Sequence, residues 1–331
     1  MTAPAGTSTV AAAPDGGAAE QVRMLRRAAV DAGMTIDDFT GPSSRHEVVD
    51  GLRLHLLDWG TDGRPPVVFL HGTALTAHTW DLVALSLRAD YHCVAVDLRG
   101  HGDSEWSPTL DYGVARHAQD VLRLLDSGVV PTPCHLVGMS IGGVVALTCA
   151  ALAPEQVSSV AVLDIGPETF RLMRERMMRQ RAEPDPGSAG SLASFLAAPA
   201  APATLEEHVE RAVAFNPRRD PELLRVSLLH NLRRTPDGRF VWKYDPRPYQ
   251  LGNAATGHVE DPFDRLGPLK APVLVLRGSE SQFLSRAGAQ ELTDRLGNAR
   301  WLEVPGASHS IQGDRPAELA SILRTDLLTT A

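Results

Sequence analysis

The sequence predicts an α/β fold: a mostly parallel central sheet with helices on both faces and a helical cap inserted after the sixth major strand. Short apolar runs without polar alternation recur along the chain, which is typical of parallel strands buried on both faces. Segments of helical length separate these runs, and the alternation implies a parallel sheet. The apolar runs are Val67–Leu70, Cys93–Val96, Leu136–Val137, Val160–Leu163 and Val273–Leu276, followed by a last strand at Arg300–Val304. The helical segments are Thr79–Arg88, Tyr112–Leu125, Ile141–Leu152, Arg286–Leu296 and a terminal helix around Ala317–Leu328.

The N-terminal region is expected to add a helix outside this pattern. Residues 1–19 are rich in Ala, Pro, Gly and Thr, which is typical of a disordered leader, and they lack the basic start and apolar stretch of a secretory signal. Residues 20–40 are predicted to contain a helix, because apolar residues from Val22 to Ala32 recur at helical spacing and Gly33 is typical of a helix end. This helix could pack on the core, cover the pocket or mediate a homodimer.

The core is expected to occupy residues 41–166 and 265–331, and it opens with a hairpin. Two short strand candidates, His46–Val49 and Leu52–Trp59, are separated by Asp50-Gly51. This dipeptide is a strong hairpin signal, because both of its residues tolerate the positive φ of a tight turn.

Residues 167–264 interrupt the rhythm of strands and helices. They contain helical patterns bearing Arg and Met, an Ala/Pro-rich linker at Ala197–Thr204, and a turn at Pro236-Asp237-Gly238. A stretch this long is far beyond an ordinary loop, so it is predicted to be the helical cap. After the turn, the aromatic stretch Phe240–Pro246 could line the pocket or join the cap to the core.

Composition excludes several classes of partner. The formal net charge is −8, and no strongly basic stretch is present, which disfavours nucleic acid. No apolar run reaches the ~18 residues of a membrane span, so no membrane partner is expected. Cys93, Cys134 and Cys149 lie in or beside apolar runs without metal-type spacing, which predicts buried reduced thiols in a cytoplasmic protein. No metal and no organic cofactor are implied.

The strongest chemical signal is the sequence Gly138-Met139-Ser140-Ile141-Gly142-Gly143, which lies between a predicted strand and a predicted helix. This is the G-x-S-x-G pattern of a nucleophile elbow in its required context. Glycine suits the positions that flank the serine, because the turn is too tight for Cβ atoms there. The helix N-terminus behind Ser140 favours the negative charge that develops during attack on a carbonyl. Ser140 is therefore predicted to be a nucleophile.

With this motif and three others, the chain resembles the α/β-hydrolase superfamily over about Glu47 to the C-terminus. His71-Gly72 closes a strand, as in the family's oxyanion loop, and the segment from Asp97 to Ser104 is similar to the loop after the family's next strand. His309 follows the last strand, where the family's catalytic histidine is found. The resemblance is strongest to the capped branch that holds esterases, lactonases, C–C bond hydrolases and haloalkane dehalogenases. It implies an α/β-hydrolase fold with a serine nucleophile.

His309 is the predicted general base. A serine hydroxyl at neutral pH needs a neighbour that takes its proton during attack, and imidazole titrates near working pH. The sequence has 12 histidines, and His309 is preferred because the order serine, acid, histidine matches this fold.

The acid that orients His309 departs from the family's usual pattern. In most relatives an Asp stands in the loop after the strand Val273–Leu276, but here Ser281 and Gln282 occupy the corresponding positions and only Glu280 carries a carboxylate. Asp164 ends the neighbouring strand, 24 residues beyond Ser140. The position of Asp164 resembles that of the acid in haloalkane dehalogenases and certain lactonases. Because the ends of adjacent strands lie ~5 Å apart, a carboxylate on Asp164 is within reach of the loop that carries His309. Asp164 is therefore favoured as the acid, and Glu280 is the alternative.

The remaining site predictions concern the oxyanion and the pocket. The backbone N–H groups of Thr73 and Ile141 are the candidate oxyanion donors. Apolar side chains from the core and the cap are expected to wall the cleft. The predicted wall consists of Trp80, Met139, Met173, Met177 and Trp242. Packing of the cap helix against the core is the alternative role for Met173 and Met177.

These features predict a serine hydrolase that cleaves a carboxylic ester or lactone of a hydrophobic small molecule through an acyl-serine intermediate. One alternative is a C–C bond hydrolase of a β-diketone or vinylogous ketone, which would use the same residues. A second alternative is a non-catalytic, ligand-binding relative, which the missing acid after Val273–Leu276 keeps open.

Overall fold

The computed structural model of the chain describes residues 18–60, 63–182, 203–215, 221–250 and 261–328. Its centre is an eight-stranded sheet in the order β1-β2-β4-β3-β5-β6-β9-β10. The first three strands in this order pair antiparallel, and all other neighbours pair parallel. The strands are β1 (Ser43–Val49), β2 (Leu52–Asp58), β3 (Pro66–Leu70), β4 (His92–Asp97), β5 (Cys134–Met139), β6 (Val157–Leu163), β9 (Val273–Gly278) and β10 (Ala299–Val304). The predicted parallel α/β sheet is confirmed.

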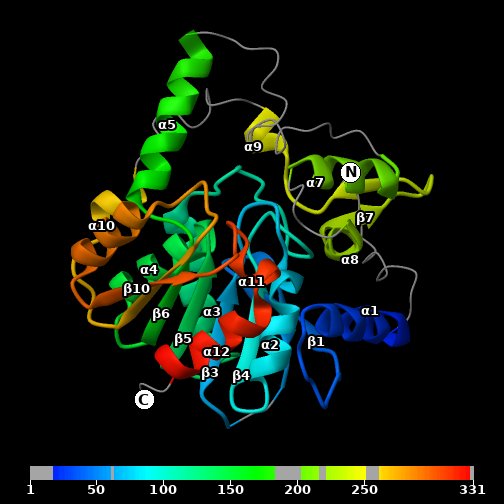
Figure 1. The fold of residues 1–331 in the computed structure, drawn as a ribbon, viewed down its shortest axis with the longest axis horizontal. Coiled ribbons are helices and arrows are strands. Elements are labelled where there is room, and N and C mark those ends of the chain that lie inside the picture. The colour runs from blue at the N-terminus through cyan, green and yellow to red at the C-terminus, as the bar shows by residue number, and fades with distance from the viewer. Residues whose placement is uncertain (1–17, 61–62, 183–202, 216–220, 251–260, 329–331) are drawn as a thin grey trace, which may run out of the picture.

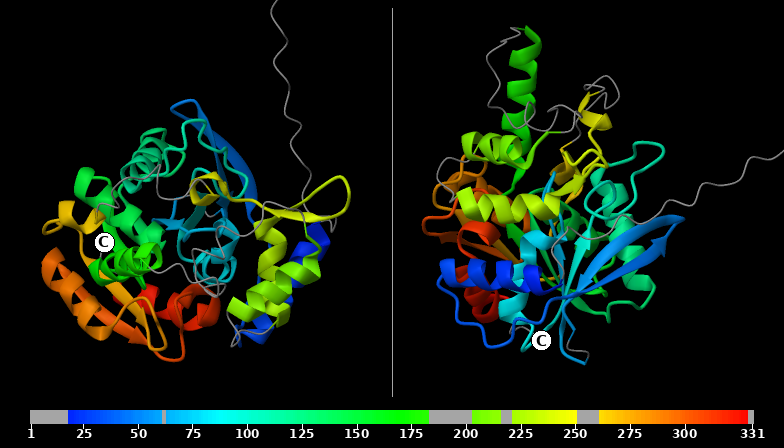
Figure 2. Two further views of the ribbon diagram at one scale, coloured as in Figure 1. Left: turned by 90° about the horizontal axis from the view of Figure 1, so that it is seen from above. Right: turned by 90° about the vertical axis from the view of Figure 1, so that its right-hand side faces the viewer.

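Helices cover both faces of the sheet (Figures 1 and 2). One face packs against α3 (Val114–Asp126), α4 (Ile141–Leu152) and α10 (Arg286–Leu296), which share a buried apolar cluster with β3, β5, β6 and β9. The other face packs against α2 (Asp81–Leu87) and α12 (Pro316–Asp326), next to the short elements η1 (Ala77–Trp80) and α11 (Ile311–Asp314). Successive strand residues alternate between the clusters: Val68 and Leu70 join the first, and Val67 and Phe69 join the second.

The predicted hairpin is confirmed. Val49 pairs with Leu52 across the turn, and Asp50 and Gly51 both have positive φ, at 47° and 77°. Two successive positive φ values define the turn that matches the right-handed twist of paired strands, which explains the preference for this dipeptide.

The N-terminal helix α1 (Ala18–Asp31) packs on the core. Ala28 and Ala29 are buried, half-buried Leu25 packs against the apolar cluster of α2 and α12, and Gly33 follows the helix with φ of 68°. Of the three roles open from the sequence, contact with the core is the one seen in the structure. Residues 1–17 of the predicted leader lie outside the described residues.

Between β6 and β9 the chain forms an inserted segment, defined here as residues 167–264. Its described elements are α5 (Pro167–Ala182), α7 (Leu205–Phe215), α8 (Pro221–Asn231), β7 (Leu232–Arg234), β8 (Phe240–Trp242), α9 (Arg247–Gln250) and most of η3 (Pro262–Arg265). In Figure 1, α5 rises from the end of β6, and α7 and α8 lie apart from it above α1. Helices α7 and α8 share a small apolar cluster with the β7–β8 hairpin. Most of the predicted linker Ala197–Thr204 lies outside the described residues.

The stretch after β8 joins the inserted segment to the core. Asp245 donates its backbone N–H to the carbonyl of Gly100 over 2.8 Å and accepts a hydrogen bond from the hydroxyl of Tyr112 over 2.5 Å. Lys243 forms an ion pair with Asp103 at 2.9 Å. Of the two roles open from the sequence for this stretch, joining segment to core is the one that these contacts support.

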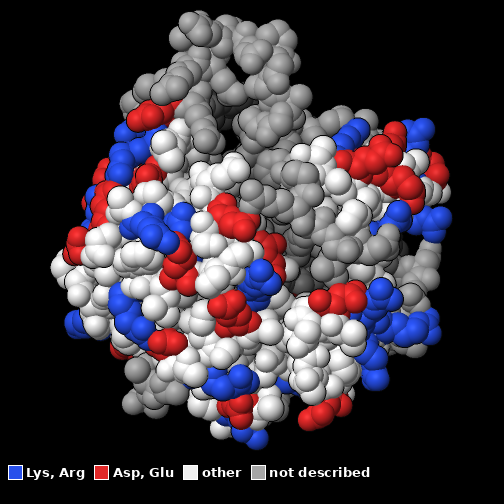
Figure 3. All heavy atoms as spheres, viewed as in Figure 1, with Lys and Arg blue, Asp and Glu red and all other residues white. Residues whose placement is uncertain are grey.

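Charged side chains are spread over the surface, and the cysteines lie inside the protein. On the face drawn in Figure 3, acidic and basic side chains are interspersed over much of the described surface. None of the helices in the described part of the chain combines the length and apolar character needed to cross a membrane. The three cysteines are buried free thiols.

Candidate active site

Ser140 occupies a strained turn between β5 and α4. Its φ is 53° and its ψ is −124°, a region that non-glycine residues rarely adopt and that is found mainly at functional sites. The backbone N–H of Ser140 donates to the carbonyl of Leu163 at the end of β6 over 2.9 Å, and its carbonyl accepts from Gly143 over 2.9 Å. These bonds hold the serine at the junction of two strands, with its side chain half-buried.

The flanking glycines are sterically required, as the sequence predicts. A Cβ atom on Gly138 would lie 2.2 Å from the carbonyl oxygen of Gly142, and one on Gly142 would lie 2.3 Å from the carbonyl oxygen of Leu70. Both contacts are with backbone atoms, which cannot rotate away. The elbow therefore packs directly against the end of β3, from which the loop with the predicted oxyanion donor begins.

Asp164 lies on the strand next to the nucleophile. It follows β6 directly, its φ is 54°, and its side chain is fully buried. Its Oδ1 accepts a hydrogen bond from the backbone N–H of Gly278 over 3.0 Å, and its Oδ2 accepts one from the hydroxyl of Ser281 over 2.5 Å. A buried carboxylate needs such donors, because it has lost its contact with water.

His309 completes the group. Its Nδ1 lies 2.8 Å from Oδ2 of Asp164, so the ring donates there and leaves Nε2 to accept a proton. One face of the imidazole ring stacks on Phe283, with the ring centroids 4.1 Å apart. The loop that carries His309 is fixed by Asp314, which accepts from the N–H of Ser308 over 2.9 Å. The imidazole is thus held both by a charged partner and by an aromatic surface.

Glu280, the alternative acid, is placed differently. Its side chain is exposed, whereas the bond from His309 Nδ1 goes to the fully buried Asp164. The geometry favours Asp164 over Glu280 as the partner of the histidine.

Ser281 is a site residue that sequence reasoning did not assign. Its hydroxyl donates to Asp164 and accepts from the backbone N–H groups of Phe283 and Leu284, over 3.0 and 3.1 Å. Ser281 stands where related sequences carry their acid, and in this chain it supports the displaced carboxylate. The sequence signal was a serine at the position where related sequences carry an Asp. That this serine binds Asp164 could be identified only from the fold.

The loop after β3 lies beside Ser140. A Cβ atom on Gly72 would lie 3.3 Å from the Cβ of Ser140. His71 fixes this loop: its Nδ1 donates to the carbonyl of Gly72 over 2.7 Å, and its Nε2 accepts from the N–H of Leu98 over 3.0 Å. This arrangement requires a neutral ring, and burial lowers the pKa of His71 accordingly.

The two predicted oxyanion donors are available. The backbone N–H groups of Thr73 and Ile141 donate to no other group in the described part of the chain. Ile141 opens α4, where the first N–H groups of a helix have no partner within it. Both residues are half-buried.

Comparison with known proteins identifies the family. A sequence profile of the alpha/beta hydrolase family matches residues 67–322. The chain belongs to this family. The α/β hydrolase is 31% identical over 285 residues to the esterase Rv0045c of Mycobacterium tuberculosis, covering 86% of this chain and 89% of that protein. A solved structure of that esterase, from work on its transition metal inhibition and structural refinement, superimposes with a TM-score of 0.70 at 30% identity and covers 92% of this chain and 97% of the other.

Two further relatives carry more specific names. The sn-1-specific diacylglycerol lipase ABHD11 of Mus musculus is 30% identical, covering 81% of this α/β hydrolase and 82% of the lipase. The solved structure of Est816, described as an N-acyl homoserine lactone degrading enzyme, has a TM-score of 0.63 and 25% identity, covering 86% of this chain and all of the other. The similarity to named esterases and hydrolases supports one conclusion: this α/β hydrolase is a serine hydrolase of the carboxylesterase type.

Two of the predicted pocket residues in this α/β hydrolase lie in the core. Trp80 is fully buried and packs on Phe69, with ring centroids 5.2 Å apart, so its prediction as an accessible wall is wrong. The reason is the 3-10 turn of η1, which directs the indole onto the sheet. Met139 is 3% exposed and belongs to the same apolar cluster, and its sulfur lies against Gly72. Met139 therefore supports the loop beside Ser140 from within.

The other three pocket predictions fall in the inserted segment. Met173 on α5 is 44% exposed, whereas Phe170 packs on Phe263, so the two residues do not share a buried face. The side chain of Met177 lies outside the described residues. Trp242 is half-buried and packs edge-to-face on His208, with ring centroids 5.3 Å apart. Its described contacts lie within the inserted segment itself.

Proposed function

We propose that this hydrolase cleaves a carboxylic ester or lactone of a hydrophobic small molecule through an acyl-serine intermediate on Ser140. The observation that carries the proposal is the hydrogen bond from His309 to the buried Asp164, on the strand end to which the backbone of Ser140 is bonded. A serine, a histidine and a carboxylate in this relation supply the nucleophile, the base and the group that orients the base.

In the proposed reaction, the hydroxyl oxygen of Ser140 attacks the carbonyl carbon while His309 Nε2 takes the hydroxyl proton. The N–H groups of Thr73 and Ile141 donate to the carbonyl oxygen as it becomes negative. His309 then gives its proton to the leaving alkoxide, and the C–O bond breaks to leave an acyl-serine. A water molecule, deprotonated by His309, attacks the acyl carbon. The bond to the serine oxygen then breaks, His309 returns the proton to that oxygen, and the carboxylic acid is released.

Asp164 serves this sequence without touching the substrate. Its bond to Nδ1 fixes the orientation of the ring and leaves Nε2 available to accept the serine proton, and its charge stabilises the imidazolium that forms. The bonds from Gly278 and Ser281 hold the carboxylate in turn.

The apolar surroundings of the reacting groups support a hydrophobic substrate. Phe283 is half-buried and stacks on His309, and the half-buried Ile141 follows Ser140 directly. We propose that the inserted segment caps this region and selects the substrate. The buried free thiols of the three cysteines support the reducing cytoplasm as its location.

The test is labelling with a fluorophosphonate, combined with hydrolysis of p-nitrophenyl acetate and butyrate and of a γ-lactone series. We expect labelling of the wild-type chain, none of Ser140→Ala, and turnover of at least one ester or lactone. Absence of labelling in the wild type would contradict the proposed nucleophile. Labelling without turnover of any ester or lactone would favour cleavage of a C–C bond in a diketone.

A further inference from the structure

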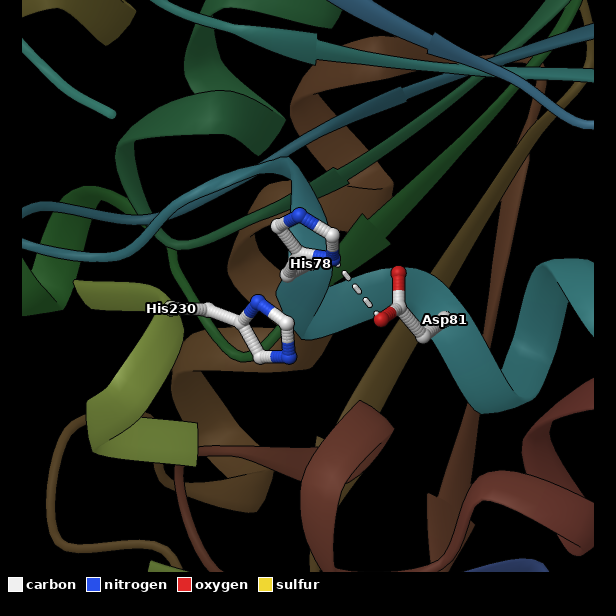
Figure 4. Close-up of side chains that lie close together, drawn as sticks. All are labelled: His78, Asp81 and His230. Carbon is white, nitrogen blue, oxygen red and sulfur yellow. Dashed lines mark hydrogen bonds and ion pairs between the residues drawn. The ribbon is translucent and has the colours of Figure 1, made fainter. Parts of the chain in front are cut away.

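A group of side chains outside the catalytic residues gathers where the inserted segment meets the core (Figure 4). His78 lies in η1, Asp81 begins α2, and His230 lies near the end of α8. One nitrogen of each imidazole and one carboxylate oxygen lie within 4.8 Å of one another. None of these three residues has a part in the reaction proposed for Ser140.

The contacts within this group leave ligand atoms available. His78 Nδ1 lies 2.9 Å from Oδ2 of Asp81, and the rings of His78 and His230 stack with centroids 3.8 Å apart. In the described part of the chain, the two ring nitrogens of His230 have no hydrogen-bond partner, and the Nε2 of His78 has none either. The only hydrogen bond within the group joins His78 to Asp81. The remaining ring nitrogens can therefore act as metal ligands.

The backbone around the group is held from both sides. The hydroxyl of Thr76 donates to the side-chain oxygen of Asn231 over 3.1 Å, joining the residues next to η1 and His230. Gln312 donates to the hydroxyl of Thr79 over 3.1 Å. These two bonds join the elements that carry the three side chains to each other and to the core.

The group also offers a carboxylate oxygen. In the described part of the chain, Oδ1 of Asp81 is buried and has no hydrogen-bond partner, so this carboxylate can still accept a cation beside the two imidazoles.

We propose that His78, Asp81 and His230 form a binding site for one divalent late transition metal, of which Zn²⁺ fits best. Zn²⁺ prefers imidazole nitrogen and carboxylate oxygen at about 2.0–2.2 Å, with a fourth position open to water. Ligand atoms around a tetrahedral ion lie roughly 3.3 Å apart, so no pair in the group has to approach by more than about 1.5 Å when the ion binds.

A second group of similar composition shows the contrast. His55, Asp97 and Asp103 also lie close together. Asp97 already accepts hydrogen bonds from the Nδ1 of His55 over 2.7 Å and from the N–H of Ala77 over 2.6 Å. That carboxylate is satisfied within the core, whereas Oδ1 of Asp81 has no hydrogen-bond partner in the described part of the chain.

The metal would link the inserted segment to the core, because His230 belongs to α8 and the other two ligands belong to η1 and α2. An ion that binds only the folded chain stabilises it by mass action. At a concentration about 100 times the dissociation constant, we expect the Tm to rise by about 5 °C.

The experiment is titration of the full, metal-stripped chain with ZnCl₂ at pH 8 by calorimetry, and with CoCl₂ by visible absorption. We expect one ion per chain and an absorption band from bound cobalt. His230→Gln and Asp81→Asn should each weaken binding by about 100-fold or more, in line with the loss of a metal ligand. These variants must retain the metal-free Tm and the fluorophosphonate labelling of the wild type, which separates loss of the site from loss of the fold.

Two control variants decide where the ion sits. His46→Gln removes an exposed histidine on β1, and His309→Gln removes the histidine of the proposed active site. Binding that survives both changes but is lost in His230→Gln supports the site. Binding that is equal in the wild type and in His230→Gln, or that is lost only in His309→Gln, overturns it.

Discussion

The catalytic edge of the core and the inserted segment are held in place by different means. At the edge, Ser140 and Asp164 both sit at positive φ on adjacent strand ends, and backbone hydrogen bonds link them to neighbouring strands. The inserted segment is joined to the core largely by side chains, such as Lys243 to Asp103 and Tyr112 to Asp245. Reacting groups positioned by the backbone tolerate little change, whereas a segment joined by side chains can vary with the substrate.

The largest effect is expected at the nucleophile. Ser140→Ala removes the attacking oxygen, and kcat for p-nitrophenyl butyrate should fall by about 10⁵-fold or more. The fold should be unaffected, so the Tm and the far-UV circular dichroism should match those of the wild type. Turnover within tenfold of the wild type would show that Ser140 is not the nucleophile.

The next effect tests the claim that the backbone sets the catalytic edge. Gly142→Ala places a methyl group 2.3 Å from the carbonyl oxygen of Leu70, so we expect a loss of about 3 kcal/mol in the free energy of unfolding by urea. Gly41→Ala is the matched control, because nothing lies within 4 Å of its Cβ, and it should change stability by less than about 0.5 kcal/mol. Equal costs at the two positions would contradict the steric argument.

A smaller effect is expected at the support of the displaced acid. Ser281→Ala removes the hydroxyl that donates to Asp164, and loss of a hydrogen bond to a charged group costs about 1.5–3 kcal/mol. We therefore expect kcat to fall by about 10- to 100-fold with little change in KM, and the pH profile of kcat to shift. Ser281→Thr retains the hydroxyl and should recover most of the activity. If Ala and Thr behave alike, the hydroxyl has no such role.

The smallest effect is expected where the inserted segment meets the core. Lys243→Met breaks an ion pair whose Asp103 side chain is 48% exposed, and such pairs contribute less than about 1 kcal/mol. Thermal unfolding should shift by no more than about 3 °C, and kcat for p-nitrophenyl acetate should stay within about twofold. A loss as large as that of Gly142→Ala would remove the distinction between the two regions.

The same difference explains what could be predicted from the sequence. The strands and the Asp50-Gly51 turn were predicted correctly, because apolar runs and turn dipeptides act locally. The bond between Asp164 and His309 was accessible too, since the order of parallel strands brings their ends together. Their roles in catalysis stay a prediction until they are tested.

The pocket could not be predicted in the same way. Helical spacing places Phe170 and Met173 near one another on α5, but which of them is covered depends on where that helix leaves the core. The burial of Trp80 depends on the direction of a short 3-10 turn, which has no distinct sequence signal. The donor role of Ser281 likewise depends on a partner that lies 117 positions away in the chain.

The central claim is that Asp164, and not Glu280, is the carboxylate that serves His309. Its direct test is the steady-state kinetics of Asp164→Asn and Glu280→Gln on p-nitrophenyl butyrate, with fluorophosphonate labelling as a second readout. We predict that Asp164→Asn lowers kcat by about 10³- to 10⁴-fold and slows labelling, while Glu280→Gln stays within about twofold of the wild type. A loss of several orders of magnitude in Glu280→Gln alone would contradict the account.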